Sequence, residues 1–288
     1  MKFYQKEISD EDFKKYHGKH FNESWYTHII SGNSDGYQYD TKKVLFKFRK
    51  NVISQELSDL AINTFLKESK KKHSNRGLAG GIPEGKSTSR ILTDSGQSEG
   101  QYTSSNISGY FDRPLREHRG TLGTIVACRT TAFTLKNQQL WKHGLPFLQK
   151  CSAIYKKLGG RYYENQKKEY GSIKVSLKIP NTVFTTVTSN YNWRTACHTD
   201  SGDFSGGLGN LVVVGNNFTG GYLGFPQFKV LIKIEPGDFL LMDVHQFHCN
   251  TRISKKADGF RLSFVMYIRE DMSKCNKQKI IEGTNYFV

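Results

Sequence analysis

The chain is predicted to fold as a mostly β protein with flanking helices (α+β), built on a jelly-roll core. Short strand-like segments follow one another from residue 173 to residue 268, and turns rich in Gly, Asn and Pro separate them. Helical periodicity is confined mainly to segments that come before them. The expected strands are 173–179, 183–188, 211–214, 230–235, 239–242 and 261–268, and the expected turns are Gly215–Asn217, Gly220–Gly221 and Pro236–Asp238.

The length of 288 residues suits one large domain, or one domain with an extension. A content of 13% aromatic residues argues against disorder. The chain has no run of apolar residues long enough to span a membrane, and its first residues lack the apolar stretch of a signal peptide. We therefore expect an intracellular monomer, nuclear or in the host cytoplasm if the gene is viral.

The cysteines predict reduced thiols. Their number is odd and no CxxC pair occurs, which argues against both a disulfide framework and a structural zinc site. Cys151 falls on the apolar face of a predicted helix, so we expect it in the core. The five cysteines are Cys128, Cys151, Cys197, Cys249 and Cys275.

Residues 1–75 are predicted to form an extension of helices and strands that packs on the core. Ser9 begins an acidic, capped helix start, and 43–49 alternates as a strand does. Residues 54–71 have one apolar face and lysines in the last turn, which predicts a scaffold helix. The core domain is expected over 76–272, followed by a polar tail over 273–288.

The segment 74–108 is rich in Gly and Ser and is predicted to be a long loop. Arg76, Lys86 and Arg90 suit contacts to phosphate, and the alternative is an insertion without a role. Further on, 124–129 is expected to be a strand. A helix should follow with Pro146 in its first turn and Gly159–Gly160 at its end.

Between Gly159 and Ser172 the chain is polar and basic, with interleaved tyrosines. We predict a surface segment, most simply a loop. Nucleobases could stack on such tyrosines, although ordinary surface loops have the same composition.

His198 and Asp200 are two residues apart, so in an extended segment they point to the same side. A second histidine, His245 or His248, follows the predicted strand 239–242. Two histidines and one carboxylate on neighbouring strands form the facial triad of non-haem Fe(II) oxygenases, which leaves three coordination positions for a 2-oxo acid and dioxygen. Arg261 opens the next strand and could bind the far carboxylate of 2-oxoglutarate.

The net charge of +16 suggests a polyanionic partner, of which nucleic acid is the commonest. The alternative for each basic cluster taken singly is solvated surface charge. The clusters are 42–50, 70–76, 156–174 and 252–256.

Over about two-thirds of its length, the chain resembles the TET/JBP family of nucleobase dioxygenases. The resemblance implies a double-stranded β-helix core, Fe(II) and 2-oxoglutarate. In the family pattern the second histidine ligand precedes a small residue and Asn, which assigns the role to His248 and leaves His245 beside the site. The matching segments are Phe184–Thr188, Asn190, Asn192–Asp203, Gly220–Leu223, Pro236–Asn250 and Arg261–Tyr267, with weaker similarity at Gly109–Arg113 and Cys128–Thr134.

Five more residues are expected to bind ligands. Arg194 is a candidate for the cosubstrate or for phosphate, with a structural ion pair as the alternative. A carboxylate at the place of Asp203 contacts the target pyrimidine in TET-like enzymes, which mildly favours 5-methylcytosine, while a cap on the neighbouring turn is the simpler role. Arg269 occupies the position where some TET-like enzymes carry a base-contacting histidine, and this difference leaves the identity of the target base undecided. Asn190 and Arg76 complete the expected substrate contacts.

The resemblance implies a dioxygenase that oxidises the C5-methyl group of a pyrimidine in DNA, with ascorbate as a reductant in assays. The reaction would convert 5-methylcytosine to 5-hydroxymethylcytosine and further products, or thymine to 5-hydroxymethyluracil, on a flipped or single-stranded nucleotide. A 2-oxoglutarate hydroxylase of protein side chains or small metabolites is one alternative. A non-catalytic reader of modified DNA is the other.

Overall fold

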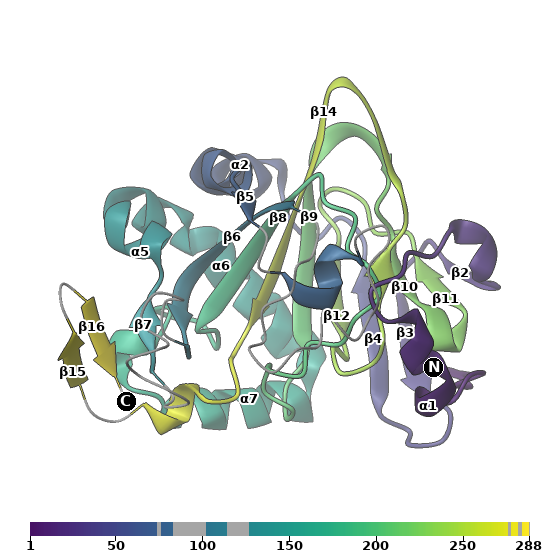
Figure 1. Ribbon diagram of the computed structural model, residues 1–288, viewed down its shortest axis with the longest axis horizontal. Helices are drawn as coiled ribbons and strands as arrows, with labels where there is room; N and C mark the ends of the chain where they lie inside the picture. Colours follow the sequence, from purple (N-terminus) through teal and green to yellow (C-terminus); the bar gives the residue numbers. More distant parts are fainter. Residues whose placement is uncertain (74–75, 83–101, 114–126, 276–277, 282–283, 288) are drawn as a thin grey trace.

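The computed structural model describes residues 1–73, 76–82, 102–113, 127–275, 278–281 and 284–287. Two β-sheets pack face to face in it, and helices cover the outer face of the larger sheet (Figure 1). In spatial order the larger sheet contains β1 (Lys2–Tyr4), β3 (Ser34–Gln38), β4 (Val44–Arg49), β12 (Phe239–Met242), β9 (Gly209–Gly220), β14 (Ile253–Tyr267), β8 (Thr186–Tyr191), β6 (Thr103–Phe111) and β5 (Lys72–His73), and β7 (Arg129–Thr130) pairs with β6.

The smaller sheet contains β13 (Cys249–Asn250), β10 (Leu223–Phe225), β11 (Val230–Ile232) and β2 (His28–Ile30). A separate hairpin of β15 (Gln278–Ile281) and β16 (Thr284–Phe287) lies near the C-terminus. The α-helices are α1 (Asp10–Phe13), α2 (Gln55–Ser69), α5 (Ala132–Lys136), α6 (Gln138–Gly159) and α7 (Arg161–Ser172). Short 3₁₀ helices are Lys14–Tyr16, Glu23–Trp25, Gly77–Gly80, Val175–Leu177, Pro226–Phe228 and Met272–Lys274.

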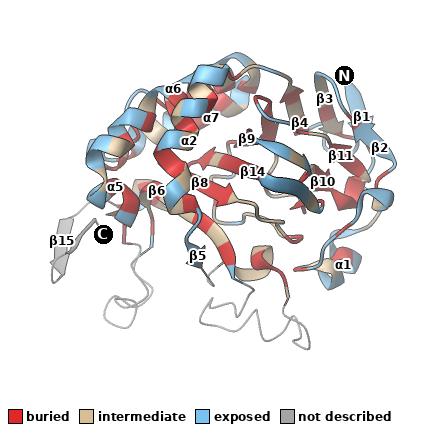
Figure 2. Cartoon of the chain, turned by 90° about the horizontal axis from the view of Figure 1, so that it is seen from above, coloured by how far each residue is buried: buried red, intermediate tan, exposed pale blue. Residues whose placement is uncertain are grey.

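Strand β14 runs antiparallel between β8 and β9, with Phe264 opposite both Ser189 and Val212. Side chains alternate along a strand, so every second residue points to the helices. Phe264 packs there against Phe65 of α2 and Phe147 of α6, with ring centroids 5.3 and 5.0 Å apart. This helix-covered core forms the red interior beneath α2 and α6 in Figure 2.

The opposite face of the larger sheet meets the smaller sheet. Phe46, Val213 and Leu240 of the larger sheet pack against Phe225 and Ile232 of the smaller one. This apolar filling occupies one part of the sandwich, and the polar cavity described below occupies another. The mixed sheet-rich architecture with flanking helices confirms the predicted jelly-roll class.

Several local predictions are confirmed. The helix expected over 54–71 is α2, and Ser54 caps it by accepting a hydrogen bond from the Leu57 backbone N–H. The strands expected over 43–49 and 239–242 are β4 and β12. Cys151 is fully buried in the helix-covered core, as expected.

Two predicted features of the helical region are wrong. Pro146 lies well inside α6, because the helix starts at Gln138 and buries Trp141 and Gly144 before it reaches the proline. The polar segment after Gly160 is the helix α7 and not a loop. It is held by tertiary contacts, such as the hydrogen bond that Gln166 donates to the Val183 carbonyl.

Two predicted features of the strand region are also wrong. Residues 173–179 form no strand. Ile173, Leu177 and Ile179 are buried around a short 3₁₀ helix, whereas Val175 is exposed, so the side chains do not alternate as they would on a sheet. The glycine and asparagines at 215–217 do not end a strand, because β9 continues to Gly220. The register of the β9–β14 pair shifts just beyond Gly215, between Asn216 and Phe218.

The prediction of reduced thiols is wrong for two cysteines, because Cys128 and Cys275 form a disulfide. They are 147 residues apart in sequence, and only the fold brings their Cα atoms to 5.9 Å. Cys151, Cys197 and Cys249 are free and buried.

The N-terminal residues contribute directly to both sheets. Strands β1, β3 and β4 belong to the larger sheet, and β2 pairs in parallel with β11 of the smaller one. The division of the chain at residues 75 and 272 remains a prediction. Among the residues described here, no helix is long and apolar enough to cross a membrane.

Candidate active site

Three candidate ligands meet at one end of the smaller sheet. The backbones of His198 and His248 exchange two hydrogen bonds, His198 N–H to His248 O at 3.1 Å and His248 N–H to His198 O at 3.0 Å. This antiparallel pairing puts the two imidazoles side by side, with ring centroids 4.4 Å apart. Asp200 completes the group, and one ligand atom from each of the three residues lies within 4.8 Å of the others.

Hydrogen bonds set the direction of both imidazoles. His198 Nδ1 lies 2.8 Å from the Ala196 carbonyl, and His248 Nδ1 lies 2.9 Å from the Gln246 carbonyl. A carbonyl only accepts, so each Nδ1 carries the proton and each Nε2 is left with its lone pair. The Nε2 atoms of His198 and His248 face the Asp200 carboxylate at 3.4 and 3.6 Å.

The two histidines keep the Asp200 carboxylate ionised, as a metal site requires. Burial by itself would raise the pKa of Asp200, but the two histidines hold that pKa well below its usual range. Burial would lower the pKa of His198, and Asp200 outweighs it and raises that pKa. A carboxylate that stays ionised between two imidazoles is a suitable ligand set for a divalent cation.

A cavity of about 500 Å³ opens beside the three residues. Its walls combine apolar groups with many polar ones, and such a lining suits a polar small molecule or a nucleobase. Among the polar residues, Asn190 is buried and its Oδ1 has no hydrogen-bond partner. Lining residues that matter here are Arg76, Phe111, Asn190, Asp203, Tyr267 and Arg269.

Arg261 is almost completely buried, with an exposed fraction of 1%. Its Nη1 donates to the hydroxyl of Ser263, a residue that lines the cavity, but Nε and Nη2 have no partner. Burial lowers the pKa of Arg261 to about 10. A buried guanidinium with unused donors is costly, and a bidentate carboxylate would satisfy it.

Gly221 makes room for that guanidinium. A Cβ at this position would lie 2.6 Å from Arg261 Nε, and the backbone φ of 66° also disfavours any other residue. The predicted Gly220–Gly221 turn is therefore part of the Arg261 pocket.

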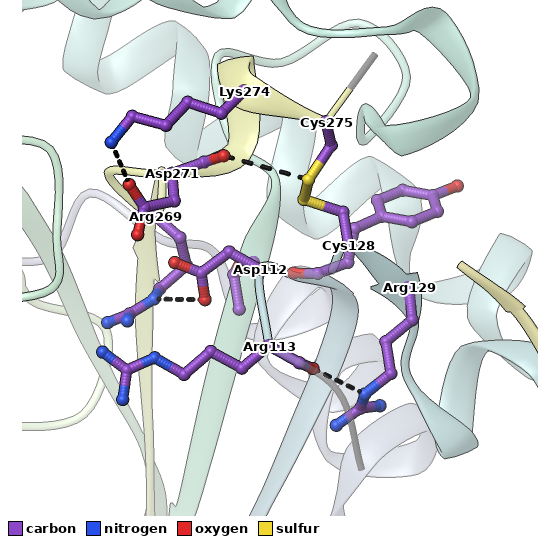
Figure 3. The surroundings of a disulfide bond; sticks show 10 residues. Asp112, Arg113, Cys128, Arg129, Arg269, Asp271, Lys274 and Cys275 are labelled. Atoms are coloured by element: carbon purple, nitrogen blue, oxygen red, sulfur yellow. Dashed lines mark hydrogen bonds and ion pairs between the residues drawn. A yellow bond between two sulfur atoms is a disulfide. The ribbon is translucent and has the colours of Figure 1, made fainter. Parts of the chain in front are cut away.

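Asp203 does not present a free carboxylate to the cavity. Its Oδ1 lies 3.3 Å from Arg269 Nη1, and Arg269 Nε donates to Asp112 at 3.1 Å. Burial and the nearby Asp200 raise the pKa of Asp203 well above its usual range, although Arg269 opposes the shift. Burial would lower the pKa of Arg269, but Asp112 is foremost among the groups that raise it. Figure 3 shows the Arg269–Asp112 pair beside the Cys128–Cys275 disulfide.

Arg76 and Arg194 occupy different environments. Arg76 lines the cavity and donates to Ser105 at 2.9 Å, and burial lowers its pKa. Arg194 instead donates to the Phe21 carbonyl at 2.8 Å and to Asn22, which ties the N-terminal segment to the core. We therefore leave Arg194 out of the site proposed below. Lys86 and Arg90 lie outside the described residues.

His245 lies beside the group of candidate ligands and not within it. Its Nδ1 pairs with Asp243 at 3.5 Å, and its Nε2 lies 3.2 Å from the Asp203 carbonyl. The geometry thus favours His248 over His245 as the third ligand, in agreement with the prediction.

Sequence reasoning missed several residues of the cavity wall. Ser263 and Tyr267 share a strand face with Arg261, so the period of two could have identified them. Thr188, which hydrogen-bonds the Tyr267 hydroxyl at 2.9 Å, had no local signal, because only strand pairing brings it to the cavity. Asp112, the partner of the cavity-lining Arg269, had none either.

The residues present fit Fe(II) and 2-oxoglutarate. Two Nε2 atoms and a carboxylate converge as a facial triad requires, and a buried arginine with unpaired donors lies behind the same cavity. The fit rests on the donor set and on the unsatisfied guanidinium.

A family model described as the oxygenase domain of the 2OGFeDO superfamily, Tet_JBP, matches residues 107–270. Thymine dioxygenase JBP1 of Trypanosoma brucei brucei is 36% identical over 168 residues, which cover 57% of this chain and 19% of the relative. The protein of the same name from Crithidia fasciculata is 34% identical over 178 residues, covering 61% and 21%. The chain thus spans about a fifth of the length of these relatives.

A solved structure described as NgTET1 in complex with 5mC DNA has a similar fold. It superimposes with a TM-score of 0.56 and 14% sequence identity, over 91% of this chain and 88% of that one. The family match covers more than half of the chain and includes all three candidate ligands and Arg261. The chain therefore belongs to the Tet_JBP family of oxygenase domains, within the superfamily that uses Fe(II) and 2-oxoglutarate.

Proposed function

We propose that the chain is a dioxygenase that oxidises the C5-methyl group of a pyrimidine in DNA, with His198, Asp200 and His248 as its Fe(II) ligands. The observation that carries the proposal is the combination of this ligand group, which lines the cavity, with the partly unpaired Arg261, which donates to the cavity-lining Ser263. A structural metal site would have no need of a buried arginine with free donors.

Each residue has a defined task in this proposal. The Nδ1 hydrogen bonds hold both imidazoles with Nε2 toward the metal position. Arg261 binds the far carboxylate of 2-oxoglutarate through Nε and Nη2, which are unpaired in the absence of a ligand. Bound Fe(II) supplies the activation of dioxygen that attack on a methyl group requires. The surrounding residues position the substrate and exclude water.

A single nucleobase suits the cavity beside these groups. A base stacked inside a duplex cannot enter a buried site, so the nucleotide must be flipped out or single-stranded. Asn190 and Arg269 would contact the base edge, and Arg76 would bind a phosphate or the base at the entrance. The net charge of +16 supports a polyanionic substrate.

Two pyrimidines are candidates. The relatives of known name are thymine dioxygenases, and the solved structure of similar fold holds 5-methylcytosine DNA. The products would be 5-hydroxymethyluracil, or 5-hydroxymethylcytosine and its more oxidised forms. A DNA substrate would place the protein in a nucleus, or in the host cytoplasm if the gene is viral.

The test is mass spectrometry of nucleosides from two duplexes incubated with the protein, Fe(II), ascorbate and 2-oxoglutarate. One duplex carries 5-methylcytosine, and the other carries unmodified thymine and cytosine. We expect an oxidised pyrimidine from at least one of them and none with His198→Ala. If neither base changes while succinate still forms, the cofactor assignment stands and the DNA substrate is wrong, which would favour a protein or metabolite hydroxylase. Binding of modified DNA without any turnover would indicate a reader.

A further inference from the structure

We propose that Arg269 reads the 4-position of the target pyrimidine and selects a base with a carbonyl there, thymine, over 5-methylcytosine. The inference rests on the proposed function, since it assumes that a pyrimidine enters the cavity. It assigns base choice to a residue that comes from the end of β14 and not from the metal-binding segment.

Two carboxylates fix Arg269 in place. Nε pairs with Asp112, which follows β6, and Nη1 pairs with Asp203, which follows the candidate ligand Asp200 by three residues. The guanidinium also lies over the ring of Phe111 at 5.1 Å. Figure 3 shows the side chain extended toward Asp112. A guanidinium held from three sides has one orientation, which base discrimination requires.

The guanidinium also lies close to the candidate metal ligands. A Cβ added at Gly202 would overlap Nη1, Nη2 and Cζ of Arg269, so the group rests directly on the turn that joins Asp200 to Asp203. The Asp203 N–H donates to the Asp200 carbonyl at 3.1 Å and closes that turn. A base whose methyl group points to the metal position would have one of the two ring positions beside C5 near this wall. A wall of N–H donors suits C4, which carries a polar substituent, and not C6, which carries only hydrogen.

Arg269 offers donors only. Arginine has five N–H groups and no acceptor, and the hydrogen bonds recorded among the described residues use Nε–H and one N–H of Nη1. Thymine carries an acceptor oxygen at position 4, whereas cytosine carries an amine there, which is a donor. The guanidinium thus complements thymine, and the cytosine amine would meet a second donor.

The other polar groups do not reverse this preference. Asp203 could still accept from a cytosine amine, but its Oδ1 already accepts a hydrogen bond from Arg269, so that amine would lie next to the guanidinium donors. Asn190 Oδ1 is free to accept from the ring N3–H of thymine. A side-chain amide can rotate to donate instead, so Asn190 by itself would tolerate either base. Discrimination therefore depends on Arg269.

The experiment compares two duplexes that differ at one position, thymine or 5-methylcytosine, in competition for the same protein with Fe(II), ascorbate and 2-oxoglutarate. We expect the wild-type kcat/KM to favour thymine by about 10-fold or more, the discrimination typical of one well-made base contact. Arg269→Gln should bring the ratio near one, because glutamine can either donate or accept. Arg269→Lys, which keeps a cationic donor, should keep part of the preference.

Arg269→Gln leaves two buried carboxylates without their partner, so the variant could fail to fold. A double variant, Arg269→Gln with Asp203→Asn, removes one charge of each sign, so that only Asp112 is left without its partner. Formation of succinate without DNA reports an intact metal and cosubstrate site in either variant. Binding of each duplex to the His198→Ala protein adds a readout that does not depend on turnover.

The outcomes separate the two proposals. A wild-type preference for 5-methylcytosine, or an unchanged ratio in both Arg269 variants that form succinate, would overturn the role of Arg269 and leave the proposed function intact. If the wild type forms succinate and oxidises neither base, the proposed function itself fails, and this inference fails with it.

Discussion

Strand β14 has two faces with opposite properties. On one face, Leu262, Phe264 and Met266 pack beneath the helices in a fully apolar core. On the other, Arg261 and Ser263 carry polar groups at or beneath the cavity. The comparison shows how one strand supplies stability through one face and candidate chemistry through the other.

The two faces also differ in how well their groups are satisfied. The apolar face buries groups that gain free energy on leaving water, about 1.5–3 kcal/mol for a large side chain. The cavity face holds a guanidinium with unpaired donors, and the adjacent strand β8 adds an amide oxygen without a partner. Buried polar groups without a partner lower the stability of the free protein, but they contribute to the binding free energy once a ligand forms hydrogen bonds with them.

The largest effect should come from the candidate metal site. Asp200→Ala removes the anionic ligand, so turnover of 2-oxoglutarate should fall by more than about 1,000-fold. Succinate release measures this loss, and Asp258→Ala, an exposed carboxylate in the same strand β14, serves as the control. Normal turnover in the Asp200 variant would exclude the residue as a ligand.

The next effect concerns the helix-covered face. Phe264→Ala leaves a cavity between Phe65 and Phe147 and should lower the free energy of unfolding by about 3–5 kcal/mol. Denaturant unfolding gives this value. Val265→Ala, the neighbouring residue that faces the cavity, should cost about 1 kcal/mol. Equal losses for the two variants would contradict the division between the faces.

Replacement of Arg261 should increase the free energy of unfolding, whereas the core variants above decrease it. Burial lowers the pKa of Arg261 to about 10, which corresponds to a cost on the order of 3 kcal/mol for keeping the guanidinium charged at neutral pH. Arg261→Met keeps the volume and should raise the free energy of unfolding by about 1–3 kcal/mol, while it abolishes binding of 2-oxoglutarate. Calorimetric titration and denaturant unfolding on the same sample test both effects. A destabilised variant would mean that the donors are satisfied in solution.

The smallest effect on stability should come from His245, whose imidazolium is paired with Asp243. The hydrogen bond to Asp243 raises the pKa of His245 against the effect of burial. A histidine whose pKa is raised in the folded state stabilises it fully below its unfolded pKa of about 6.5, and the contribution disappears as the pH rises through the folded pKa. His245→Gln should therefore lower stability by about 0.5–1 kcal/mol at pH 5.5 and have little effect at pH 9. Unfolding curves at the two pH values test this, and a loss that is the same at both would exclude the pair.

Local pattern was sufficient for much of the candidate site. The alternation after Arg261 depends on the period of a strand, which β14 keeps. His198 forms only an isolated bridge, but its ligand atom and that of Asp200 converge as their spacing predicts. The helix α2 was likewise predictable from its own residues, because its cap and its apolar face are local.

The failures share one cause. The helix α7 has few apolar residues, and buried contacts of Tyr163 and Gln166 hold it in place. The segment 173–179 has the composition of a strand, but it forms a 3₁₀ helix that buries Ile173, Leu177 and Ile179 and leaves Val175 exposed. In both cases tertiary packing outweighs local preference, which contributes only tenths of a kcal/mol per residue.

By itself, the sequence determined the residue types of the candidate site, the strand period that brings His198 and Asp200 to one side, and the excess of positive charge. Only the tertiary structure decided that Asp203 is engaged by Arg269, that Arg261 lacks a partner, and that Cys128 meets Cys275. The reason is physical. The alternation of side chains within a strand follows from backbone geometry over a few residues. The Asp203–Arg269 and Cys128–Cys275 pairs instead join segments that are far apart in the sequence. Only the packing of the sheets and helices brings those segments into contact.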